Sequence, residues 1–481
     1  MNPESLFSPI SPDSLRATDA APDVPFCVEL GVDPRLRVVR LLRVLPGRRL
    51  VGEAWLDDTH VLAKLFVSSS SARHYTREID GITRLRNAGI ATPELVAHGR
   101  LPPGGHYVLT RFLEKAESFA SHWSAVLHTS PGRESISNAL CPIFTLLGRL
   151  HQAGLTHDDL HPGNFLIDGE SLLVIDGDAV RGEPGTAVRT EAATRNLGML
   201  FAQYPVTIED TMDKLLDAYT SGNPSAQIDP ILLNTAIDRA RQARWLDYAR
   251  KLQRNCSLFS FERTHRKLLA VERCEQAALA PLINAPDDWI AQGTALKRGR
   301  TATVSLVNHN GRAWVIKRYN IKNALHALSR APRPTRAWKS WIEGHRLERL
   351  GIATAIPRAV MESRFGPLRG RGWLISDYVP GVPLSTLLNP DVPPDVETAD
   401  ALTTLFRALV RCRITHGDLK ASNLIWHEGR IHLIDLDATT QHRSDAAFRR
   451  AWARDRSRLI RNWPSDSQLV SWLNLNLPPV K

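Results

Sequence analysis

Two segments of the chain carry the same polar residues at the same spacing. Each holds a histidine, an aspartate two residues later, an asparagine five residues after that aspartate, and a second aspartate twelve residues further on. The two sets are His157, Asp159, Asn164 and Asp176, and His416, Asp418, Asn423 and Asp435. Residues of these types can face an acceptor hydroxyl and hold Mg²⁺ on nucleotide phosphates, which transfer of the terminal phosphoryl group of ATP requires. Because the pattern occurs twice, it predicts a duplicated domain.

The chemistry assigns a role to each residue of the pattern. Asp159 and Asp418 are the predicted catalytic carboxylates, which would face the acceptor hydroxyl. The predicted metal ligands are the remaining polar pairs, Asn164 with Asp176 and Asn423 with Asp435. Mg²⁺ prefers a few hard oxygen ligands beside phosphate oxygens and water, and these side chains supply them. An apolar run before each metal-binding aspartate predicts a short strand, and each loop histidine is expected to hold backbone geometry.

A cation for the nucleotide phosphates is expected upstream of each loop. Lys64 and Lys317 end short β-prone runs and lie 95 and 101 residues before their catalytic aspartates. A glycine in a basic turn, Gly47 or Gly299, precedes each lysine by 17 or 18 residues. We expect these turns to be reduced phosphate-covering loops, although the full G-x-G-x-x-G motif is absent from both.

The acidic partner of the lysine is clear only in the first copy. Glu78 lies on a predicted helix ahead of the Gly-Ile-Ala-Thr segment at 89–92, and the same four residues recur at 351–354. An alignment without gaps places Ser340 at the position of Glu78. Glu343, about one helical turn later, is the predicted substitute.

The two loops also differ beside the catalytic aspartate. The first copy has Asp158 where the second has Gly417. An extra carboxylate could raise the pKa of its neighbour or disturb the loop, and it could equally point to solvent.

The residues of the two loops resemble those of a known family. A His-Gly-Asp-Leu loop and a metal turn written Ile-Asp-x-Asp, in place of Asp-Phe-Gly, are similar to the lipopolysaccharide core kinases of Gram-negative bacteria, the Kdo/heptose kinase family with a protein-kinase-like fold. The resemblance covers roughly residues 35 to 200 and 290 to 460. It implies ATP- and Mg²⁺-dependent phosphorylation of a sugar hydroxyl of the inner core by a cytoplasmic protein, at the cytoplasmic face of the inner membrane. Aminoglycoside phosphotransferases and small atypical protein kinases share the loop, so the pattern supports the fold more strongly than the acceptor.

The expected fold class is α+β, with two tandem protein-kinase-like domains. Each would have a small β-rich N-lobe and a mainly helical C-lobe. The expected boundaries are a disordered leader over 1–22, a first domain over 23–275, a linker over 276–288 and a second domain over 289–481 with a trimmed C-lobe.

Composition limits the partners and the compartment. The 481 residues carry a formal net charge of +11, which suggests an anionic partner. A lipopolysaccharide core or another hydroxyl-bearing acceptor and an anionic membrane surface are the candidates, and nucleic acid is disfavoured because no motif for it accompanies the charge. Five scattered cysteines indicate reduced thiols in a cytosolic protein. No uncharged apolar run of 18 residues is present, so no transmembrane segment is expected and membrane contact would be peripheral.

Two alternatives to a lipopolysaccharide kinase remain open from the sequence. One is a kinase that acts on a protein or on a small soluble hydroxyl compound. The other is a tandem pseudokinase scaffold that binds nucleotide without turnover. The retained lysine, aspartates and asparagine in both copies favour catalysis, whereas the thin glycine turns and the missing glutamate favour the scaffold.

Overall fold

The computed structural model describes most of the chain, namely residues 8–17, 22–31, 35–129, 132–320 and 333–479. The chain divides into two compact units. The first comprises residues 1–203 and 208–240, and the second residues 204–207 and 241–481. Each unit has a sheet followed by a mainly helical part, which confirms the predicted α+β class and the two-lobed plan of each domain.

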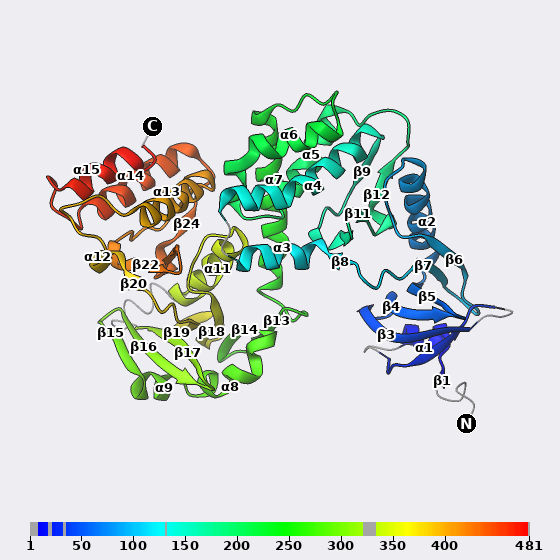
Figure 1. The fold of residues 1–481 in the computed structure, drawn as a ribbon. Helices are drawn as coiled ribbons and strands as arrows, with labels where there is room; N and C mark the ends of the chain where they lie inside the picture. The colour runs from blue at the N-terminus through cyan, green and yellow to red at the C-terminus, as the bar shows by residue number, and fades with distance from the viewer. Residues whose placement is uncertain (1–7, 18–21, 32–34, 130–131, 321–332, 480–481) are drawn as a thin grey trace. The chain divides into compact units, whose positions relative to one another are not determined.

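The N-lobe of the first unit is a seven-stranded sheet that carries helix α2 (Ser71–Asn87). The strands lie in the order β1-β2-β3-β4-β5-β7-β6, and Figure 1 labels all of them except β2. Their bounds are β1 Ser8–Pro9, β2 Phe26–Glu29, β3 Arg35–Leu45, β4 Arg49–Leu56, β5 Thr59–Phe66, β6 Leu95–Arg100 and β7 His106–Arg111. Val61, Ala63 and Leu65 of β5 are buried in the core of this lobe. Successive side chains of a strand point to opposite faces, so Lys64 lies on the face away from that core.

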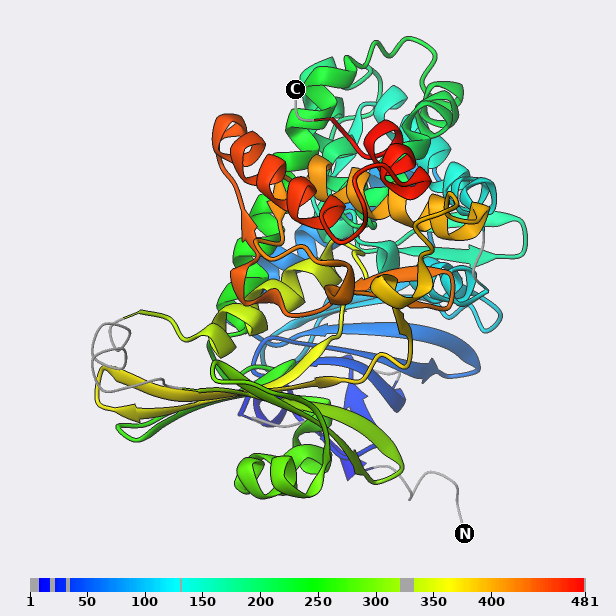
Figure 2. The same ribbon diagram turned by 90° about the vertical axis from the view of Figure 1, so that its left-hand side faces the viewer.

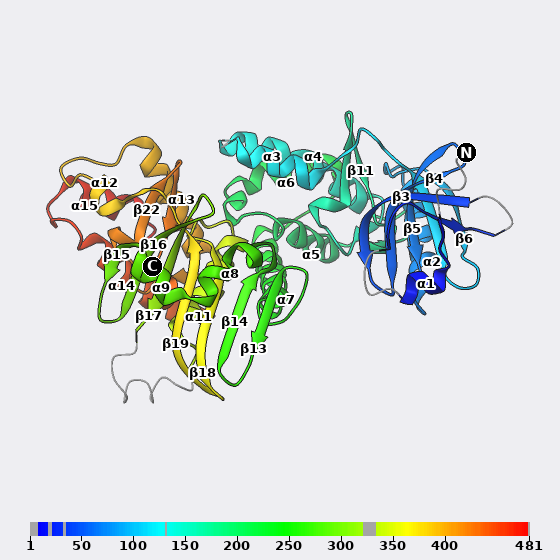
Figure 3. The same ribbon diagram turned by 90° about the horizontal axis from the view of Figure 1, so that it is seen from below.

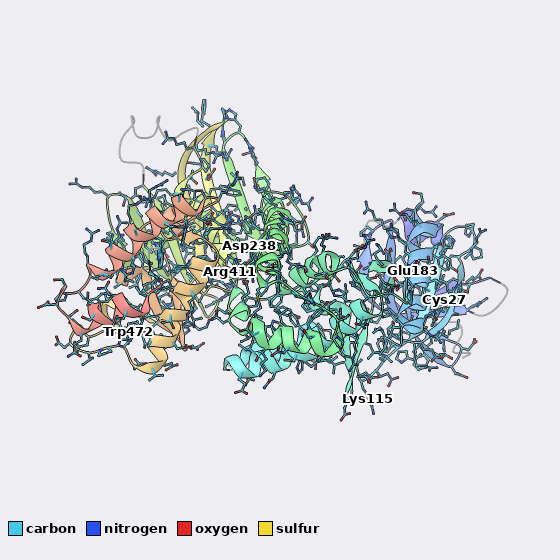
Figure 4. The ribbon with its side chains drawn as sticks, turned by 90° about the horizontal axis from the view of Figure 1, so that it is seen from above. Cys27, Lys115, Glu183, Asp238, Arg411 and Trp472 are labelled. Carbon is cyan, nitrogen blue, oxygen red and sulfur yellow. The ribbon has the colours of Figure 1, made fainter. Side chains whose placement is uncertain are left out.

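The C-lobe of the first unit holds the predicted catalytic loop between short strands. The chain enters it after β7 through residues 112–116, where Lys115 is labelled in Figure 4. Its helices are α3 Phe119–His128, α4 Arg133–Gln152, α5 Thr190–Phe201, α6 Met212–Gly222 and the start of α7 Pro230–Lys251. Its short strands are β8 Glu117–Ser118, β9 Leu155–His157, β10 Phe165–Asp168, β11 Ser171–Val174 and β12 Val180–Gly182. Strand β11 ends two residues before Asp176, as the apolar run predicted.

The N-lobe of the second unit is a second seven-stranded sheet. Its order is β13-β14-β18-β19-β17-β16-β15, which can be followed from strand to strand in Figure 3. The bounds are β13 Phe259–Arg263, β14 Lys267–Glu272, β15 Thr294–Arg298, β16 Ala302–His309, β17 Arg312–Tyr319, β18 Pro357–Phe365 and β19 Leu368–Asp377. Helix α11 (Arg336–Arg349) contacts one face of this sheet, while α8 (Gln276–Asn284) and α9 (Pro286–Gln292) cover the other (Figure 2).

The C-lobe of the second unit is built around one hydrophobic core. Its helices are α12 Leu384–Leu387, α13 Val396–Arg411, α14 Asp445–Ile460 and α15 Gln468–Asn476. Its strands are β20 Val382–Pro383, β21 Ile414–Thr415, β22 Leu424–His427, β23 Arg430–Leu433 and β24 Thr440–Gln441. Phe406 of α13 and Trp452 of α14 are among the fully buried side chains that join these elements.

The repeated Gly-Ile-Ala-Thr segments have a structural explanation. In each copy the glycine has a positive φ, 68° at Gly89 and 74° at Gly351, and it directly follows the last residues of α2 or α11. The next residue, Ile90 or Ile352, is buried, and its N–H bonds back to the carbonyl of Leu85 or Leu347 at 2.9 Å. This pattern is a Schellman cap, in which glycine supplies the left-handed residue. The repeated segment therefore marks the end of α2 in the first unit and the end of α11 in the second.

The predicted boundary between the domains differs from the structure. Strands β13 and β14 lie within the range 23–275 assigned to the first domain, yet they pair with β18 in the sheet of the second unit. The predicted linker, 276–288, contains α8 and the start of α9. The structure places the division inside α7, between Ala240 and Arg241. A strand whose partner lies about ninety residues further along the chain leaves no local signal of the sheet to which it belongs.

The predicted disordered leader is wrong for residues 8–17. Strand β1 pairs with β2, and helix α1 (Pro12–Ala17) buries Leu15 against the first sheet. Arg16 fixes this helix because its Nε donates a 2.6 Å hydrogen bond to the carbonyl of Val67. Residues 1–7 and 18–21 of the predicted leader lie outside the described residues.

Two further observations concern the thiols and the membrane. None of the five cysteines is in a disulfide, and Cys27, labelled in Figure 4, is buried on β2. In the part of the chain that the structure describes, no helix combines the length and the apolar character needed to cross a bilayer.

Candidate active sites

The loop of the first unit is held by a buried histidine. His157 is fully buried; its Nε2 donates to the carbonyl of Ile175 at 3.3 Å, and its Nδ1 accepts from the backbone N–H of Asp159 at 3.2 Å. The amide of Asn196 brackets the same residue, since its Oδ1 accepts from the His157 N–H and its Nδ2 donates to the His157 carbonyl. Burial lowers the pKa of His157. Both ring nitrogens are therefore engaged in backbone geometry, as the sequence predicted for this residue.

The metal turn of the first unit meets the lysine and the glutamate. Asp176 adopts a left-handed conformation with φ 68° immediately after the strand segment. Lys64 Nζ lies 2.6 Å from Glu78 Oε1 and 3.3 Å from Asp176 Oδ1, and all three side chains are largely buried. Burial opposes ionisation of Lys64, but the carboxylates of Glu78 and Asp176 outweigh it and raise the pKa of the lysine. Burial likewise opposes ionisation of Asp176, while Lys64 and Arg49 outweigh it and lower the pKa of that carboxyl.

Two glycines allow this arrangement. A Cβ at Gly81 on α2 would lie 2.0 Å from the carbonyl oxygen of Gly177, and a Cβ at Gly177 would lie 2.5 Å from the carbonyl oxygen of Glu78. Helix α2 therefore touches the metal turn backbone to backbone. The contact is reinforced because the N–H of Asp178 donates to Glu78 Oε2 at 3.1 Å. Glu78 is thus fixed at both oxygens, one toward Lys64 and one toward the turn.

The loop of the second unit repeats the backbone geometry of the first. His416 is buried; its Nε2 donates to the carbonyl of Ile434 at 2.8 Å, and its Nδ1 accepts from the N–H of Asp418 at 3.3 Å. A buried carboxylate, Asp455, takes the place of the amide seen in the first unit and accepts from the N–H groups of His416 and Gly417 at 2.7 and 2.9 Å. Asp435 is again left-handed, with φ 64°.

The surroundings of the second lysine are different. Lys317 forms an ion pair with Asp435, and its ammonium lies 4.7 Å from the ring centre of Tyr319. Ser340, at the position of Glu78, is buried and bonds to the Tyr319 hydroxyl at 2.8 Å. The described residues therefore contain no glutamate that pairs with Lys317.

The prediction that Glu343 substitutes for the missing glutamate is wrong. Glu343 pairs with Arg346 on its own helix at 2.8 Å, and no ion pair joins it to Lys317 within the described ranges. Burial raises the pKa of its carboxyl against the opposing effect of Arg346. The alignment that places Ser340 on Glu78 places Glu343 on Gly81, the position where the first unit has no side chain at all. The side chain of Glu343 therefore contacts Arg346 of its own helix and does not orient Lys317.

The two predicted catalytic aspartates also have different neighbours. Asp418 accepts from Arg458 at 2.9 Å on one oxygen and from Lys420 at 3.0 Å on the other. The carboxylate of Asp159 has neither a hydrogen bond nor an ion pair to any residue that the structure describes. In both copies the asparagine donates its Nδ2 to the carbonyl of the catalytic aspartate, at 2.8 Å from Asn164 and 2.9 Å from Asn423.

The two glycines that were predicted to lie in turns both lie in hairpin turns of their sheets. Gly47, with φ 65°, occupies the hairpin turn between β3 and β4, and Arg49 just after it lies 3.8 Å from Asp176. Gly299 occupies the turn between β15 and β16, where its N–H bonds to the carbonyl of Ala302 at 3.0 Å. Each turn thus closes a hairpin of its sheet.

The donor set of the first unit fits Mg²⁺ and ATP. Asn164 donates its Nδ2 to the backbone carbonyl of Asp159, and this bond fixes the orientation of the side-chain amide. The side-chain oxygen of Asn164 is then the atom available to bind a cation. The carboxylate of Asp176 supplies the harder oxygen ligand, and Lys64 supplies the cation for a phosphate. Asn423, Asp435 and Lys317 provide the same atom types in the second unit.

Some residues of the sites were missed by sequence reasoning. Asn196 and Asp455 both follow their loop histidine by 39 residues, so the repeat itself carried a signal for them. Arg49 contacts Asp176, and Arg458 contacts Asp418. The repeat gave no signal for either arginine, because no arginine of the other copy makes the same contact within the described residues. Arg181 pairs with Asp158 at 2.9 Å, which gives the extra carboxylate of the first loop a partner.

Comparisons with known proteins match both units of the chain to kinase-related families. Residues 59–219 match the model of the lipopolysaccharide kinase (Kdo/WaaP) family, and residues 344–463 match the model of the RIO domain. Among solved structures, WaaP in complex with acyl carrier protein is 20% identical over 44% of this chain and 86% of that chain, with a TM-score of 0.31. A mutant of the Mycobacterium tuberculosis PknI kinase domain is 14% identical over 43% of this chain and 86% of that chain, with a TM-score of 0.27. None of the curated proteins matches the chain.

The fold and the two sites define a protein with two kinase-like domains, and the family models support a phosphotransferase. The resemblance to the lipopolysaccharide core kinases that the loops indicated is confirmed by the Kdo/WaaP match in the first domain. In the second domain the matching model is that of another kinase group, the RIO domain.

Proposed function

We propose that the first unit transfers the terminal phosphoryl group of ATP to a sugar hydroxyl of the lipopolysaccharide inner core, Kdo or heptose, at the cytoplasmic face of the inner membrane. The observation that carries this proposal is the ion network of Lys64, Glu78 and Asp176 inside the segment that matches the Kdo/WaaP family. Phosphoryl transfer depends on positioned charges more than on covalent chemistry, and this network is such an arrangement.

Each residue of the first site has a role in this proposal. Asp159, whose carboxylate has no partner among the described residues, would accept the proton of the acceptor hydroxyl. Asn164 and Asp176 would hold Mg²⁺, which when bound would neutralise charge on the phosphates. Lys64, oriented by Glu78, would contact the phosphates, and the turn at Gly47 would cover them.

In the same proposal the second unit supports the first without transferring phosphate. Lys317 lacks its glutamate, and the carboxylate of Asp418 is held by Arg458 and Lys420. Because both of its oxygens contact cationic side chains, the carboxylate of Asp418 is less available to bond an acceptor hydroxyl than that of Asp159. Binding of nucleotide remains compatible with the atoms that Asn423 and Asp435 present.

The test is transfer of labelled γ-phosphate from Mg²⁺·ATP to purified, dephosphorylated lipopolysaccharide core. The full-length protein should label the core, and an Asp159→Asn variant with an unchanged melting temperature should not. Absence of labelling by wild-type protein that binds ATP would sink the proposal.

A protein kinase is the second candidate, favoured by the RIO-domain match over residues 344–463. If the second unit were the catalyst, ATP would label a protein substrate or the chain itself, and an Asp418→Asn variant would lose that labelling. Labelling that survives in Asp418→Asn and disappears in Asp159→Asn would eliminate this candidate.

Contact with the membrane is proposed to be peripheral. The formal net charge of +11 supports attraction to an anionic surface, which salt screens over about 10 Å at 0.1 M. Sedimentation with vesicles that contain anionic lipid should capture the protein at low salt and release it at high salt. Equal capture by neutral vesicles would contradict an electrostatic attachment.

A further inference from the structure

A cleft beside the first candidate site is lined by three arginines, of which Arg48 and Arg49 follow Gly47 in the turn that would cover the nucleotide phosphates. Its volume is about 770 Å³, and it lies between the β3–β4 turn and the start of α2. It is lined by Arg16, Leu45, Gly47, Arg48, Arg49, Phe66, Ser68, Ser69, Ser70, His74 and Asp178. A space of this size accommodates a small ligand such as a sugar with a charged substituent.

The lining presents three arginines to one space. Arg16 is anchored by the hydrogen bond from its Nε to the Val67 carbonyl, and its NH1 lies 3.0 Å from Asp13. Arg49 lies over the ring of Phe66, 5.9 Å from its centre. Arg48 is exposed at the tip of the turn, and no ion pair to it is found within the described residues. Guanidinium groups bind phosphate and carboxylate oxygens through paired donors, so this set favours an anion.

The start of α2 adds donors to the same wall. This helix of 17 residues has no acidic residue in its first turn, and its N-cap, Ser70, makes no capping bond with its side chain. The hydroxyl of Ser70 is instead 3.0 Å from that of Ser68. Helix N-termini carry N–H groups without intrahelical partners and a positive field, which stabilise an anion. Ser68, Ser69 and Ser70, which precede this helix, line the cleft together with the arginines.

The acidic lining residue does not cancel this charge. Asp178 Oδ2 lies 2.8 Å from His74 Nδ1, and Asp178 Oδ1 lies 3.8 Å from Arg77. Of the three arginines, Arg16 also contacts Asp13 and Arg49 also contacts Asp176, so Arg48 is the lining arginine without a carboxylate partner among the described residues.

The cleft is adjacent to the site of transfer and separate from its metal ligands. Arg49 lines the cleft and lies 3.8 Å from Asp176 Oδ1. The lining contains none of Lys64, Asp159, Asn164 or Asp176. The cleft shares the β3–β4 turn with the predicted nucleotide site and adds Arg16 and the serines before α2, so an anion held by these added residues would lie beside the phosphates of the nucleotide.

We propose that the cleft binds a phosphate group that the acceptor already carries at another position, so that the first unit binds such an acceptor more tightly than the dephosphorylated form, which it still phosphorylates. This inference rests on the proposed function, because it specifies the acceptor class for the same site. The three arginines and the serine hydroxyls of the lining supply more donors than a single carboxylate can accept, which favours a phosphate.

The test measures binding of inorganic phosphate by calorimetry to the full-length protein saturated with Mg²⁺ and a non-hydrolysable ATP analogue. Wild type should bind phosphate, and Arg48→Gln should bind it about fivefold or more weakly, because a charge-assisted contact is lost. Ser69→Glu, which places a carboxylate in the cleft, should weaken phosphate binding at least as much. Arg43→Gln is the matched control, since Arg43 is an exposed arginine of the same sheet outside the cleft, and its affinity should stay within about twofold of wild type.

Three results would overturn the proposal. They are no phosphate binding to wild type, equal weakening in Arg43→Gln, and a loss of affinity for the nucleotide analogue in Arg48→Gln as large as the loss for phosphate. Calorimetry needs no turnover, so phosphate binding without transfer to lipopolysaccharide core would refute the proposed function and leave the cleft assignment standing. With an active acceptor in hand, Arg48→Gln should raise the KM for the phosphorylated form and not for the dephosphorylated form, and the reverse would refute the assignment.

Discussion

The two copies of the loop share a backbone and differ in their charges. In both, a buried histidine joins the predicted catalytic aspartate to the segment before the predicted metal turn, and the aspartate of that turn is left-handed. Among the described residues, only the first copy pairs its lysine with a glutamate and has no cation on the predicted catalytic carboxylate. The difference shows that the motif residues serve the fold of the loop as well as its chemistry. Their retention in the second copy therefore does not by itself require that copy to be active.

The largest contrast is expected at the metal ligands. Asp176→Asn should reduce phosphate transfer by about 10³-fold, because a neutral amide stabilises Mg²⁺ on the phosphates much less than a carboxylate does. Asp435→Asn should reduce it by less than about fivefold if the second unit only supports the first. Initial rates of γ-phosphate transfer at saturating ATP would measure both. Equal losses in the two variants would mean that both units contribute to turnover.

The contact between α2 and the metal turn offers a second contrast. Gly81→Ala would place a Cβ 2.0 Å from the Gly177 carbonyl, so α2 must move away from the turn and take Glu78 with it. We expect a loss of transfer of about 10²-fold and a destabilisation of about 1–3 kcal/mol, as for other overpacked sites. Gly132→Ala, whose added Cβ has no described atom within 4 Å, is the control: it should leave the rate of transfer unchanged, and its effect on stability should be limited to the weaker N-cap of α4. A fully active Gly81→Ala protein would contradict the role given to this contact.

The acidic partner of the lysine should show a smaller effect. Glu78→Gln removes the charge that orients Lys64, and the KM for ATP should rise about tenfold, since Asp176 still neutralises the lysine. Glu343→Gln should leave the KM for ATP within about twofold of wild type, because its carboxylate pairs with Arg346. Steady-state kinetics with varied ATP would separate the two. A larger effect from Glu343→Gln would restore the original prediction for that residue.

Asn196 and Asp455, which lie 39 positions after the loop histidines, accept hydrogen bonds from the loop backbone, and substitution of Asp455 tests this contact. Asp455→Ala leaves the N–H groups of His416 and Gly417 buried without an acceptor, which should cost about 1–3 kcal/mol of stability. Asp455→Asn should cost less, since Asn196 serves the same position in the first unit. Chemical denaturation followed by tryptophan fluorescence would report both. If Asp455→Asn proved as costly as Asp455→Ala, the charge and not the acceptor would be what the loop needs.

The smallest effect is expected at the extra carboxylate of the first loop. Asp158 and Arg181 form an ion pair between partly exposed side chains, with relative exposures of 57% and 37%. Such pairs contribute about 0–1 kcal/mol, so Asp158→Asn should change stability little and transfer less than about threefold. A large loss of transfer would show that Asp158 acts on its neighbour Asp159.

The sequence predicted the parts of each site that lie close together along the chain. The loop spacing, the lysine and the helix ends at Gly89 and Gly351 are local patterns of residue type, and the structure has them in the expected elements. The direction of Glu343 could not be predicted, because it depends on the ion pair that Glu343 forms with Arg346.

Elements that depend on distant pairing were the least predictable. Strand β14 pairs with β18 and strand β1 with β2, and neither partner can be read from composition nearby. The cationic cleft was missed for the same reason, since Arg16 reaches it from α1 and Arg48 from a hairpin turn, while Ser69 comes from the start of α2. Residues that meet only through tertiary contacts give no periodic signal.

The central claim is that the first unit performs the transfer and the second does not. The most direct measurement compares Asp159→Asn with Asp418→Asn in the full-length protein, using labelled γ-phosphate transfer to dephosphorylated lipopolysaccharide core. Loss of a general base typically costs about 10²–10⁴-fold, so Asp159→Asn should fall by that factor while Asp418→Asn retains most of the wild-type rate. Transfer that persists in Asp159→Asn and is lost in Asp418→Asn would contradict the account.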